Sequence, residues 1–264
     1  MRKLSVMLAG ATALALSLSA CGGNGDDAET EAAGGMSLVN EGQLTVCSDI
    51  PYEPFEMEDE GGGYTGFDID LMTEIAAGMD LELSVQDSGF DALQSGAALA
   101  AGQCDIAASA MTITEERDEN LDFSDPYYDS LQSLLVPAGS DITSIEDLAG
   151  TQVGVQQGTT GKAYAEENAP EDAQLIDYPS DAELYTAIQA GNVEAVLQDL
   201  PVNITHTQDG EYEIVEEYDT EEQYGFAVAE EGSEELLEQV NTQLQELRDN
   251  GTYDELYEQY FSTE

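Results

Sequence analysis

The sequence predicts an α/β protein of two lobes, each a mostly parallel sheet flanked by helices, with a ligand cleft between them. Three observations carry this prediction. Strand-like and helix-like segments alternate from residue 43 onward, which favours parallel strands joined by right-handed crossovers. The same alternation starts again at residue 151. A length of 264 residues with 41% hydrophobic residues suffices for one large domain or two modest ones with a sizeable core.

Segments of the first half follow strand and helix periodicities in turn. Short or alternating apolar runs bounded by turn residues are typical of strands, and they occur at residues 43–47, 81–85 and 105–109. Apolar side chains at helical spacing predict a helix over residues 67–79, and a run of small residues predicts another over residues 92–101. This order predicts one parallel sheet with its helices.

The second half repeats the order. Strands are predicted at residues 151–155 and 193–198, with helices after the glycine-containing turn at residues 157–161 and over residues 182–190. Stripes of leucine and tyrosine at helical spacing follow over residues 236–260. We expect these stripes to pack into the core and not to hold a cofactor. No cofactor or metal site is predicted.

The first 20 residues have the composition of a secretory signal peptide. A positively charged start precedes the uncharged run 4–18, which is too short for a membrane span. The run ends in Leu-Ser-Ala-Cys, which resembles the lipobox of bacterial lipoproteins. We expect residues 1–20 to be a lipoprotein signal peptide, Cys21 the lipidation site and residues 21–40 a flexible acidic tether. The protein is then extracytoplasmic and anchored to the cell membrane through a lipid.

The charge balance excludes two classes of function. The chain has 57 acidic and 5 basic residues, a net charge of −52. Such a chain repels nucleic acid phosphates and anionic lipid headgroups, so neither nucleic acid binding nor a polybasic membrane-surface role is expected. Removal of residues 1–20 leaves three cations, Arg117, Lys162 and Arg248, against the same 57 acids, a net charge of −54.

Ligands of open parallel sheets bind at the carboxyl ends of the strands. The residues at the predicted strand ends are Asp49, Ser109 and Ala110, the Gly158 turn that contains Thr159 and Thr160, and Asp199. We therefore expect a ligand site that combines these residues.

Arg117 follows one of these strand ends. We expect Thr114 to cap a helix and Arg117 to lie in its first turn, where a cation is unfavourable unless it faces an anion. A salt bridge to one of the many carboxylates is one interpretation, and bidentate capture of a ligand carboxylate is the other. Backbone N–H groups near Thr159 and Thr160 would add to a carboxylate clamp. With Asp199 as an ammonium acceptor, the site would complement the zwitterion of an α-amino acid.

Six motifs, in order along the chain, are those of a known family. They are residues 51–56 (PYEPFE), 66–70 (GFDID), 112–117 (TITEER), 123–128 (FSDPYY), 154–160 (GVQQGTT) and 251–257 (GTYDELY). The chain resembles the bacterial extracellular solute-binding proteins of polar amino acid ABC transporters, such as histidine-, lysine/arginine/ornithine- and glutamine-binding proteins. The similarity covers residues 41–262.

The resemblance implies the two-lobed type II fold of periplasmic binding proteins. Lobe 1 would comprise residues 41–132 plus 228–264 and lobe 2 residues 133–227, with hinge strands near residues 133–137 and 223–228. We expect a monomer that closes its lobes around a free polar amino acid and delivers it to the permease subunits of an ABC importer.

The resemblance also implies how the backbone groups of the ligand are bound. Arg117 and the backbone of residues 159–160 would bind the α-carboxylate. Asp199, Thr112 and the Ala110 carbonyl would bind the α-ammonium group.

The ligand side chain would lie between two aromatic rings. The resemblance implies that Tyr52 and Phe90 enclose it and that Asp49 meets its polar end. Glu53 and Glu56 lie near Asp49 in the sequence, so a cationic or amide side chain is favoured, and cystine is an alternative ligand.

An enzyme on the same fold, of the cyclohexadienyl or arogenate dehydratase type, is the main alternative. Acid–base catalysis needs a group positioned by burial, and the many carboxylates single out none. The one histidine, His206, lies in a polar stretch, and we expect it in a surface loop. The sequence has no Cys/His metal spacing, and residues 249–251 miss the spacing of a calcium loop. The sequence therefore favours a binding protein.

Cys47 and Cys104 remain after Cys21 in an oxidising compartment. If Asp49 lies level with Ala110 on adjacent strands, Cys104 lies about four residues before the position level with Cys47. This separates the two cysteines by roughly 13 Å along the strand. A disulfide needs Cα atoms closer than about 7 Å. We therefore predict two reduced, separately buried thiols.

The net charge of −54 predicts a salt-dependent stability. Screening relieves the repulsion between carboxylates, so the melting temperature should rise from low to molar sodium chloride. Thermal unfolding followed by circular dichroism over this range measures the effect. A melting temperature that stays flat or falls contradicts the prediction.

Overall fold

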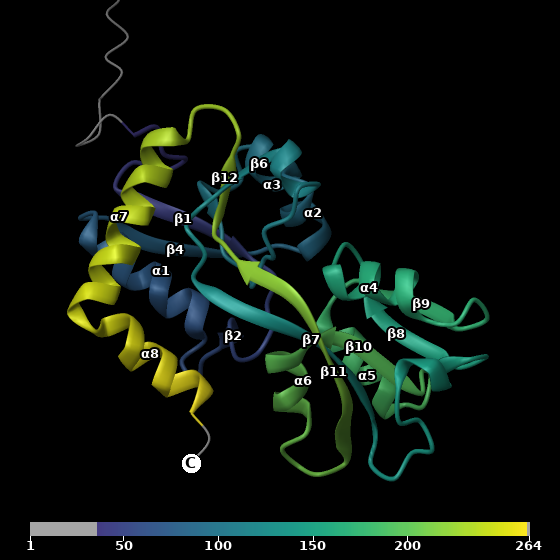
Figure 1. Cartoon of the computed structure of the whole chain (residues 1–264). Helices are drawn as coiled ribbons and strands as arrows, with labels where there is room; N and C mark the ends of the chain where they lie inside the picture. Colours follow the sequence, from purple (N-terminus) through teal and green to yellow (C-terminus); the bar gives the residue numbers. More distant parts are fainter. Residues whose placement is uncertain (1–35, 263–264) are drawn as a thin grey trace, which may run out of the picture. The chain divides into compact units, whose positions relative to one another are not determined.

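Two five-stranded sheets with helices against their faces form the described structure, residues 36–262 of a computed structural model (Figure 1). The predicted signal peptide, Cys21 and most of the predicted tether lie outside the described residues. None of the helices in the described range is long and apolar enough to cross a membrane.

The first sheet has the strand order β4-β1-β5-β12-β6. Its strands are β1 (Gln43–Ser48), β4 (Glu82–Asp87), β5 (Ile106–Ala107), β6 (Leu121–Phe123) and β12 (Ala227–Ala229). β1 is parallel to β4 and β5, as the alternation of strands and helices predicts, whereas β12 is antiparallel to β5 and β6.

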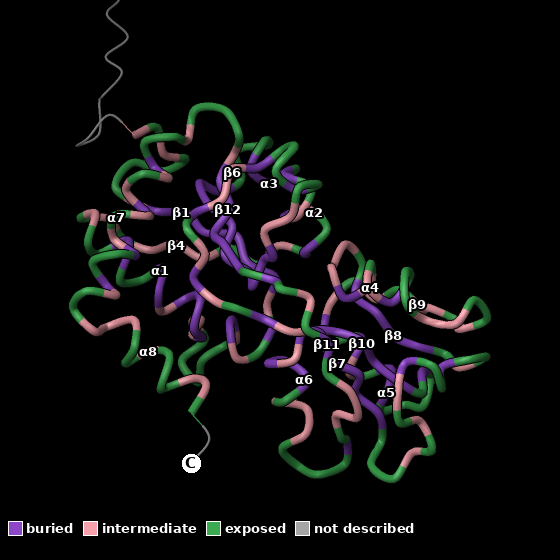
Figure 2. The backbone as a smooth tube through the Cα atoms, in the orientation of Figure 1, coloured by how far each residue is buried: buried purple, intermediate pink, exposed green. Residues whose placement is uncertain are grey.

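Both faces of β1 are buried, and helices pack on each of them (Figure 2). Leu44 and Val46 belong to the core that includes α1 (Phe67–Gly78), α7 (Glu234–Asn250) and α8 (Thr252–Phe261). Cys47 points to the other face and packs with α2 (Phe90–Gln94) and α3 (Ala97–Ala100). The alternation along one strand thus fixes which helices lie on which face.

The second sheet has the order β11-β7-β10-β8-β9. Its strands are β7 (Tyr128–Pro137), β8 (Gln152–Gln156), β9 (Gln174–Tyr178), β10 (Ala195–Asp199) and β11 (Tyr212–Tyr224). β8 is parallel to β9 and β10, and β7 is antiparallel to β10 and β11. The helices of this half are α4 (Thr160–Asn168), α5 (Asp181–Gln189) and α6 (Leu200–His206).

The two long strands β7 and β11 run side by side and join the two halves (Figure 1). At one end, Tyr128 and Tyr224 pack with the core of the first sheet. Further along, Leu134 and Tyr218 belong to the core of the second sheet. The same strand pair therefore contributes to two separate cores.

Several short elements complete the described chain. They are the hairpin β2 (Met57–Glu58) and β3 (Tyr64–Thr65) and the 3₁₀ turns Arg117–Glu119 and Ile145–Leu148. The helix predicted over residues 92–101 is instead divided into α2 and α3, because Gly96 between them has a φ of 74°. This left-handed conformation ends one helix and suits glycine.

The prediction of two reduced thiols is wrong, since Cys47 and Cys104 form a disulfide with a Cα–Cα distance of 5.8 Å. The prediction assumed extended backbone from Cys104 onward and placed Cys47 level with residue 108. In the structure Cys47 pairs with Ala107, and β5 begins only at Ile106. Cys104 precedes the strand and packs in the same core cluster as Cys47 and α3.

Reduction of this disulfide should destabilise the protein. The bridge closes a loop with a sequence separation of 57 residues, for which loop entropy corresponds to about 4 kcal/mol. Chemical denaturation with and without dithiothreitol should show a lower midpoint in the reduced sample. The Cys47→Ala, Cys104→Ala double variant is the control, since its midpoint should not respond to dithiothreitol. Equal midpoints for the oxidised and reduced wild type would contradict the prediction.

Candidate functional site

One cavity is lined by every residue that the sequence analysis predicted for the ligand site. These residues are Asp49, Tyr52, Phe90, Ala110, Thr112, Arg117, Thr159, Thr160 and Asp199. Ser109 and Gln156 also line it. The lining comes from both halves of the described chain, because β1 and β5 end on one side of it and β8 and β10 on the other.

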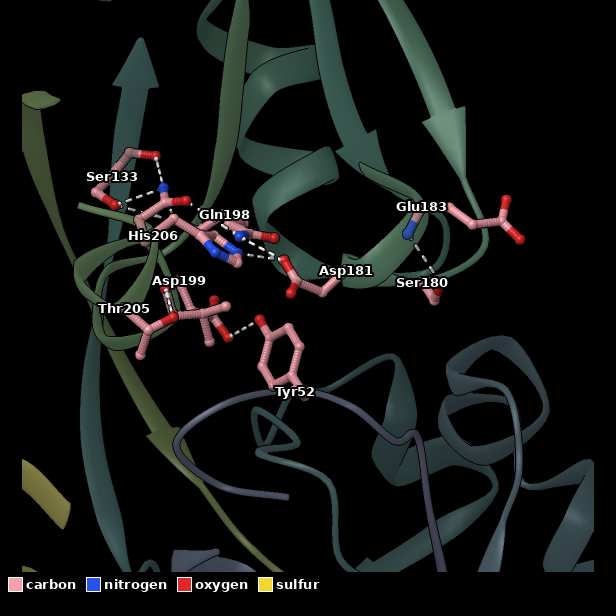
Figure 3. A network of polar contacts seen from close by, with 11 residues as sticks. Tyr52, Ser133, Ser180, Asp181, Glu183, Gln198, Asp199, Thr205 and His206 are labelled. Atoms are coloured by element: carbon pink, nitrogen blue, oxygen red, sulfur yellow. Dashed lines mark hydrogen bonds and ion pairs between the residues drawn. The ribbon is translucent and has the colours of Figure 1, made fainter. Parts of the chain in front are cut away.

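Asp199, the last residue of β10, accepts three hydrogen bonds. The hydroxyls of Tyr52 and Tyr224 donate at 2.8 and 2.6 Å, and Gln132 Nε2 donates at 2.5 Å (Figure 3 shows Tyr52). Burial raises the pKa of Asp199 to about 6, and the charge of Glu222 adds to this, while the three donors oppose it. The side chain is therefore a buried carboxylate that is held mainly by neutral donors.

Arg117 is buried against the cavity, with 5% of its surface exposed. Its guanidinium donates to the carbonyls of Thr112 at 2.6 Å and Gly158 at 3.0 Å, and it lies 5.2 Å from the centre of the Phe90 ring. Within the described residues no carboxylate lies within 4.0 Å of it. Burial lowers the pKa of Arg117, although the charge of Asp199 opposes this. Because a guanidinium has five N–H donors, the remaining ones can bind an anion.

The start of α4 lies beside Arg117. Thr159 caps the helix, since its hydroxyl accepts from the Lys162 N–H at 3.2 Å. The preceding turn needs Gly158, whose φ is 79° and whose carbonyl accepts from Arg117. The first N–H groups of a helix have no partner within the helix, so Thr160 can present its N–H to an anion.

Asp49 lines the cavity directly after the end of β1. Gln156 Nε2 donates to its carboxylate at 2.7 Å, and its own N–H donates to Ser109 Oγ at 3.1 Å. Burial raises the pKa of Asp49 to about 7, and the charges of Asp87 and Asp181 add to this. A cationic group beside Asp49 would stabilise the ionised form.

The structure changes the expectation for the other acids near Asp49. Glu56 is fully buried below the cavity and accepts from Ser109 Oγ at 2.5 Å. Glu53 lines a different hollow, beside Tyr128 and Ile204. Of the three acids that the sequence grouped together, only Asp49 lines the cavity.

Ala110 and Thr112 line the cavity on one short segment, and Ala110 has an unusual backbone conformation. Ala110 has a φ of 44°, and its N–H donates to Asp68 Oδ2 at 2.8 Å. This left-handed conformation is uncommon for alanine. The bond to Asp68 helps to hold it and so fixes the position of the segment that carries Thr112.

Some residues at the site were missed by sequence reasoning. They are Gln132, Gln156, Glu222 and Tyr224. Gln132, Glu222 and Tyr224 belong to long strands whose pairing decides which side chains face the site. Gln156 ends β8, so the strand-end rule could have found it.

The sequence predicted His206 in a surface loop, and this prediction is wrong. His206 ends α6, and its ring is largely buried. Its Nε2 lies 3.0 Å from Asp181 Oδ1 (Figure 3). The ring also stacks on Tyr185, with the ring centres 3.9 Å apart. Gln198 donates to the same Asp181 oxygen at 2.9 Å. This network fixes the end of β10 immediately before Asp199.

Two buried acids lie beneath the cavity. Glu56 and Asp68 each have one carboxylate oxygen without a hydrogen-bond partner among the described residues. Burial raises the pKa of both, that of Asp68 to about 7, and the charge of Asp68 further raises the pKa of Glu56. At neutral pH this pair therefore retains protons that exposed carboxyl groups have lost.

This pair should make the protein more stable as the pH falls from 7 toward 4. Between the ordinary carboxyl pKa and the raised one, the folded state binds more protons, so the free energy of unfolding falls as the pH rises. Asp68→Asn cannot titrate and should reduce this slope, by up to about 1.4 kcal/mol per pH unit. Denaturant unfolding at pH 5, 6 and 7 measures it.

Glu74→Gln is the control for this prediction, because it removes an exposed carboxylate from the same helix α1. Its slope should match that of the wild type. Equal slopes for Asp68→Asn and the wild type would show that Asp68 is ionised throughout this pH range.

The fold and the cavity define a two-lobed solute-binding protein of the type II architecture. The chain matches the bacterial extracellular solute-binding proteins, family 3, over residues 44–263, and it belongs to this family. A probable histidine-binding protein of Neisseria gonorrhoeae is 34% identical over 262 residues, which cover 95% of this chain and 92% of the relative.

Solved structures agree with this assignment. An ancestral arginine-binding protein bound to glutamine is 36% identical, with a TM-score of 0.79, over 85% of this chain and 100% of that one. An ancestral amino acid-binding protein, a precursor of cyclohexadienyl dehydratase, is 37% identical, with a TM-score of 0.78, over 84% of this chain and 96% of that one.

Proposed function

We propose that the chain is the substrate-binding component of an ABC importer and captures a free polar amino acid. One observation carries the proposal: a single cavity has a buried guanidinium and a helix start on its lining together with a buried carboxylate, Asp199. These charges complement the two backbone charges of an amino acid zwitterion.

The α-carboxylate is bound by Arg117 and by backbone N–H groups of Thr159 and Thr160. Arg117 suits this role because its bonds within the described chain go to carbonyls and not to a carboxylate. Asp199, Thr112 and the Ala110 carbonyl bind the ammonium group. Asp199 suits its role because its donors stabilise the ionised form and none of them is a cation.

The ligand side chain extends toward Asp49 and Gln156, between Tyr52 and Phe90. Asp49 and Asp199 are both acidic, and Arg117 is the one cation that lines this cavity. This balance favours a cationic or amide side chain. The names of the relatives cover both kinds, since one is a probable histidine-binding protein and another is an arginine-binding protein bound to glutamine. Cystine remains the alternative ligand.

Capture proceeds by closure of two lobes, residues 41–132 plus 228–264 and residues 133–227, about hinge segments of β7 and β11. Bonds such as Tyr52 to Asp199 and Gln156 to Asp49 join the lobes around the ligand. The closed monomer then docks on the permease subunits. A lipid on Cys21 tethers it to the outer side of the cell membrane.

We propose binding without turnover. The precursor of cyclohexadienyl dehydratase among the relatives makes a dehydratase the competing function, and Asp49, with a pKa of about 7, could supply a proton. Asp49 is held by Gln156, however, and its position matches recognition of a side chain. Incubation with prephenate or arogenate followed by mass spectrometry tests this, and formation of phenylpyruvate or phenylalanine above the uncatalysed rate would favour the enzyme.

A thermal-shift screen over the twenty amino acids, ornithine and cystine tests the function itself. At least one cationic or amide amino acid should raise the melting temperature, because a ligand that binds only the folded state stabilises it. If no amino acid shifts it, the proposed function is wrong.

Arg117→Ala should weaken binding of the best ligand from this screen by roughly thirtyfold to several thousandfold. The reason is that removal of one partner of a desolvated charge pair costs about 2–5 kcal/mol. Arg117→Lys should also weaken binding, since an ammonium group cannot form the bidentate fork. Calorimetric titration measures the affinities.

Arg248→Ala is a matched control for Arg117→Ala. Arg248 also donates to a backbone carbonyl, that of Pro126, and lies 5.2 Å from an aromatic ring, that of Tyr253, but it does not line the cavity. Its loss should leave the affinity within about threefold of the wild type. The same small effect for Arg117→Ala would refute the assignment of the carboxylate clamp.

A further inference from the structure

Glu222 lies on the inward face of β11, at the point where pairing with β7 resumes after an irregularity. The register of the two strands shifts between Tyr218 and Glu222, and Glu221 has a φ of 55°. Beyond the shift, Glu222 and Tyr224 are buried and Gln223 between them is exposed, as expected when side chains alternate between two faces. The bulge therefore aims Glu222 toward the same site that Tyr224 reaches.

One oxygen of Glu222 is bonded to residues from both lobes. The hydroxyls of Thr112 and Thr160 each donate to Oε2 at 2.8 Å. Gln132 Nε2 lies 3.2 Å from both carboxylate oxygens, and the Thr220 hydroxyl donates to Oε1 at 2.9 Å. Thr112 and Thr160 are themselves only 3.4 Å apart.

We propose that Glu222 is a positioning residue that couples the amino acid site to lobe closure, by holding Thr112 of one lobe and Thr160 of the other on a single carboxylate oxygen. The proposal rests on the proposed function, since it concerns two of the residues that bind the ligand. It adds a third carboxylate to the site, on the strand pair that connects the lobes.

The first consequence concerns the two hydroxyl protons. An ionised carboxylate only accepts hydrogen bonds, so Thr112 and Thr160 must both donate to Glu222. Each hydroxyl has one proton and can then only accept from the ligand. Thr112 therefore presents lone pairs, which suits an ammonium group. Thr160 is left to bind the ligand carboxylate through its backbone N–H.

The second consequence concerns the charge of Asp199. Gln132 donates to both Asp199 and Glu222, so the two carboxylates share a neighbour. After burial, the charge of Glu222 is the main cause that raises the pKa of Asp199 to about 6. Ammonium binding needs the ionised form, so affinity should decrease as the pH falls through this value. Removal of the charge of Glu222 should move this decrease to lower pH.

Most other ionisable groups around Asp199 keep one charge state near pH 6, and those that titrate are shared by the wild type and all variants. Tyr52 and Tyr224 have pKa values raised well above 10 and stay neutral near pH 6. Arg117 stays protonated, because even a lowered arginine pKa lies far above this range. Glu56 and Asp49 also titrate, but both are present in the wild type and in every variant below.

The experiment is a calorimetric titration with L-arginine and, as a second probe, L-glutamine, from pH 4.5 to 8. It uses the wild type, Glu222→Gln, Glu222→Ala and the control Glu221→Gln, which removes the same charge from the exposed neighbouring position. At pH 8 we expect affinity to fall by roughly tenfold in Glu222→Gln and up to about a hundredfold in Glu222→Ala, because buried hydroxyls lose their acceptor. In both Glu222 variants, the pH at which affinity falls on acidification should be lower than in the wild type. The Glu221→Gln control should match the wild type.

Two outcomes would overturn the proposal. Glu222 variants that match Glu221→Gln in affinity and pH profile would overturn it. Weaker binding with an unchanged pH profile would also overturn it, since a merely structural loss does not move the titration of Asp199. If Glu222→Ala does not fold by circular dichroism, the nearly isosteric Glu222→Gln decides alone. Failure of the wild type to bind any amino acid in the screen would instead refute the proposed function.

Discussion

The site depends on keeping Asp199 ionised although it is buried. A buried carboxylate is costly unless donors replace its water. Asp199 receives these donors from three places: Tyr52 from the first lobe, and Gln132 and Tyr224 from the long strands β7 and β11. The donor set is complete only when both lobes meet, so on the proposed function the group that binds the ligand's ammonium also stabilises the arrangement that encloses the ligand.

The scarcity of cations explains how such a site can discriminate. Lys162 is paired with Asp177 at 2.9 Å, and Arg248 donates to the Pro126 carbonyl. Among the described residues this leaves Arg117 as the cation that faces the cavity. On the proposed function Arg117 binds the α-carboxylate, so an acidic side chain would meet Asp49 with no positive charge beside it. The composition and the site thus disfavour the same ligands, the acidic amino acids.

How far the sequence could predict the site follows from what kind of signal each residue gives. Asp49 follows a buried strand of the first sheet and Asp199 ends a buried strand of the second. The carboxyl ends of such strands are where open parallel sheets bind ligands, so both residues could be predicted without knowledge of the loops. The disulfide could not be predicted in this way. It depends on Cys47 pairing with Ala107, one residue from the predicted partner, and on β5 starting only at Ile106, after Cys104. Glu222 is one of many acids in the sequence, and only the bulge in β11 turns it inward.

Glu222, Gln132 and Tyr224 show that the strands joining the lobes also carry polar contacts of the site. Closure brings the negative charges of Asp49, Asp199 and Glu222 to one small cavity with a single cation, which opposes closure by repulsion. On the proposed function, the ligand contributes an ammonium group and a cationic or amide side chain at the positions where repulsion is largest. A ligand can shift a conformational equilibrium only through its different affinity for the two states. Here that difference arises from charge neutralisation, so analogues of the ligand that lack the α-ammonium group should bind without driving the lobes together.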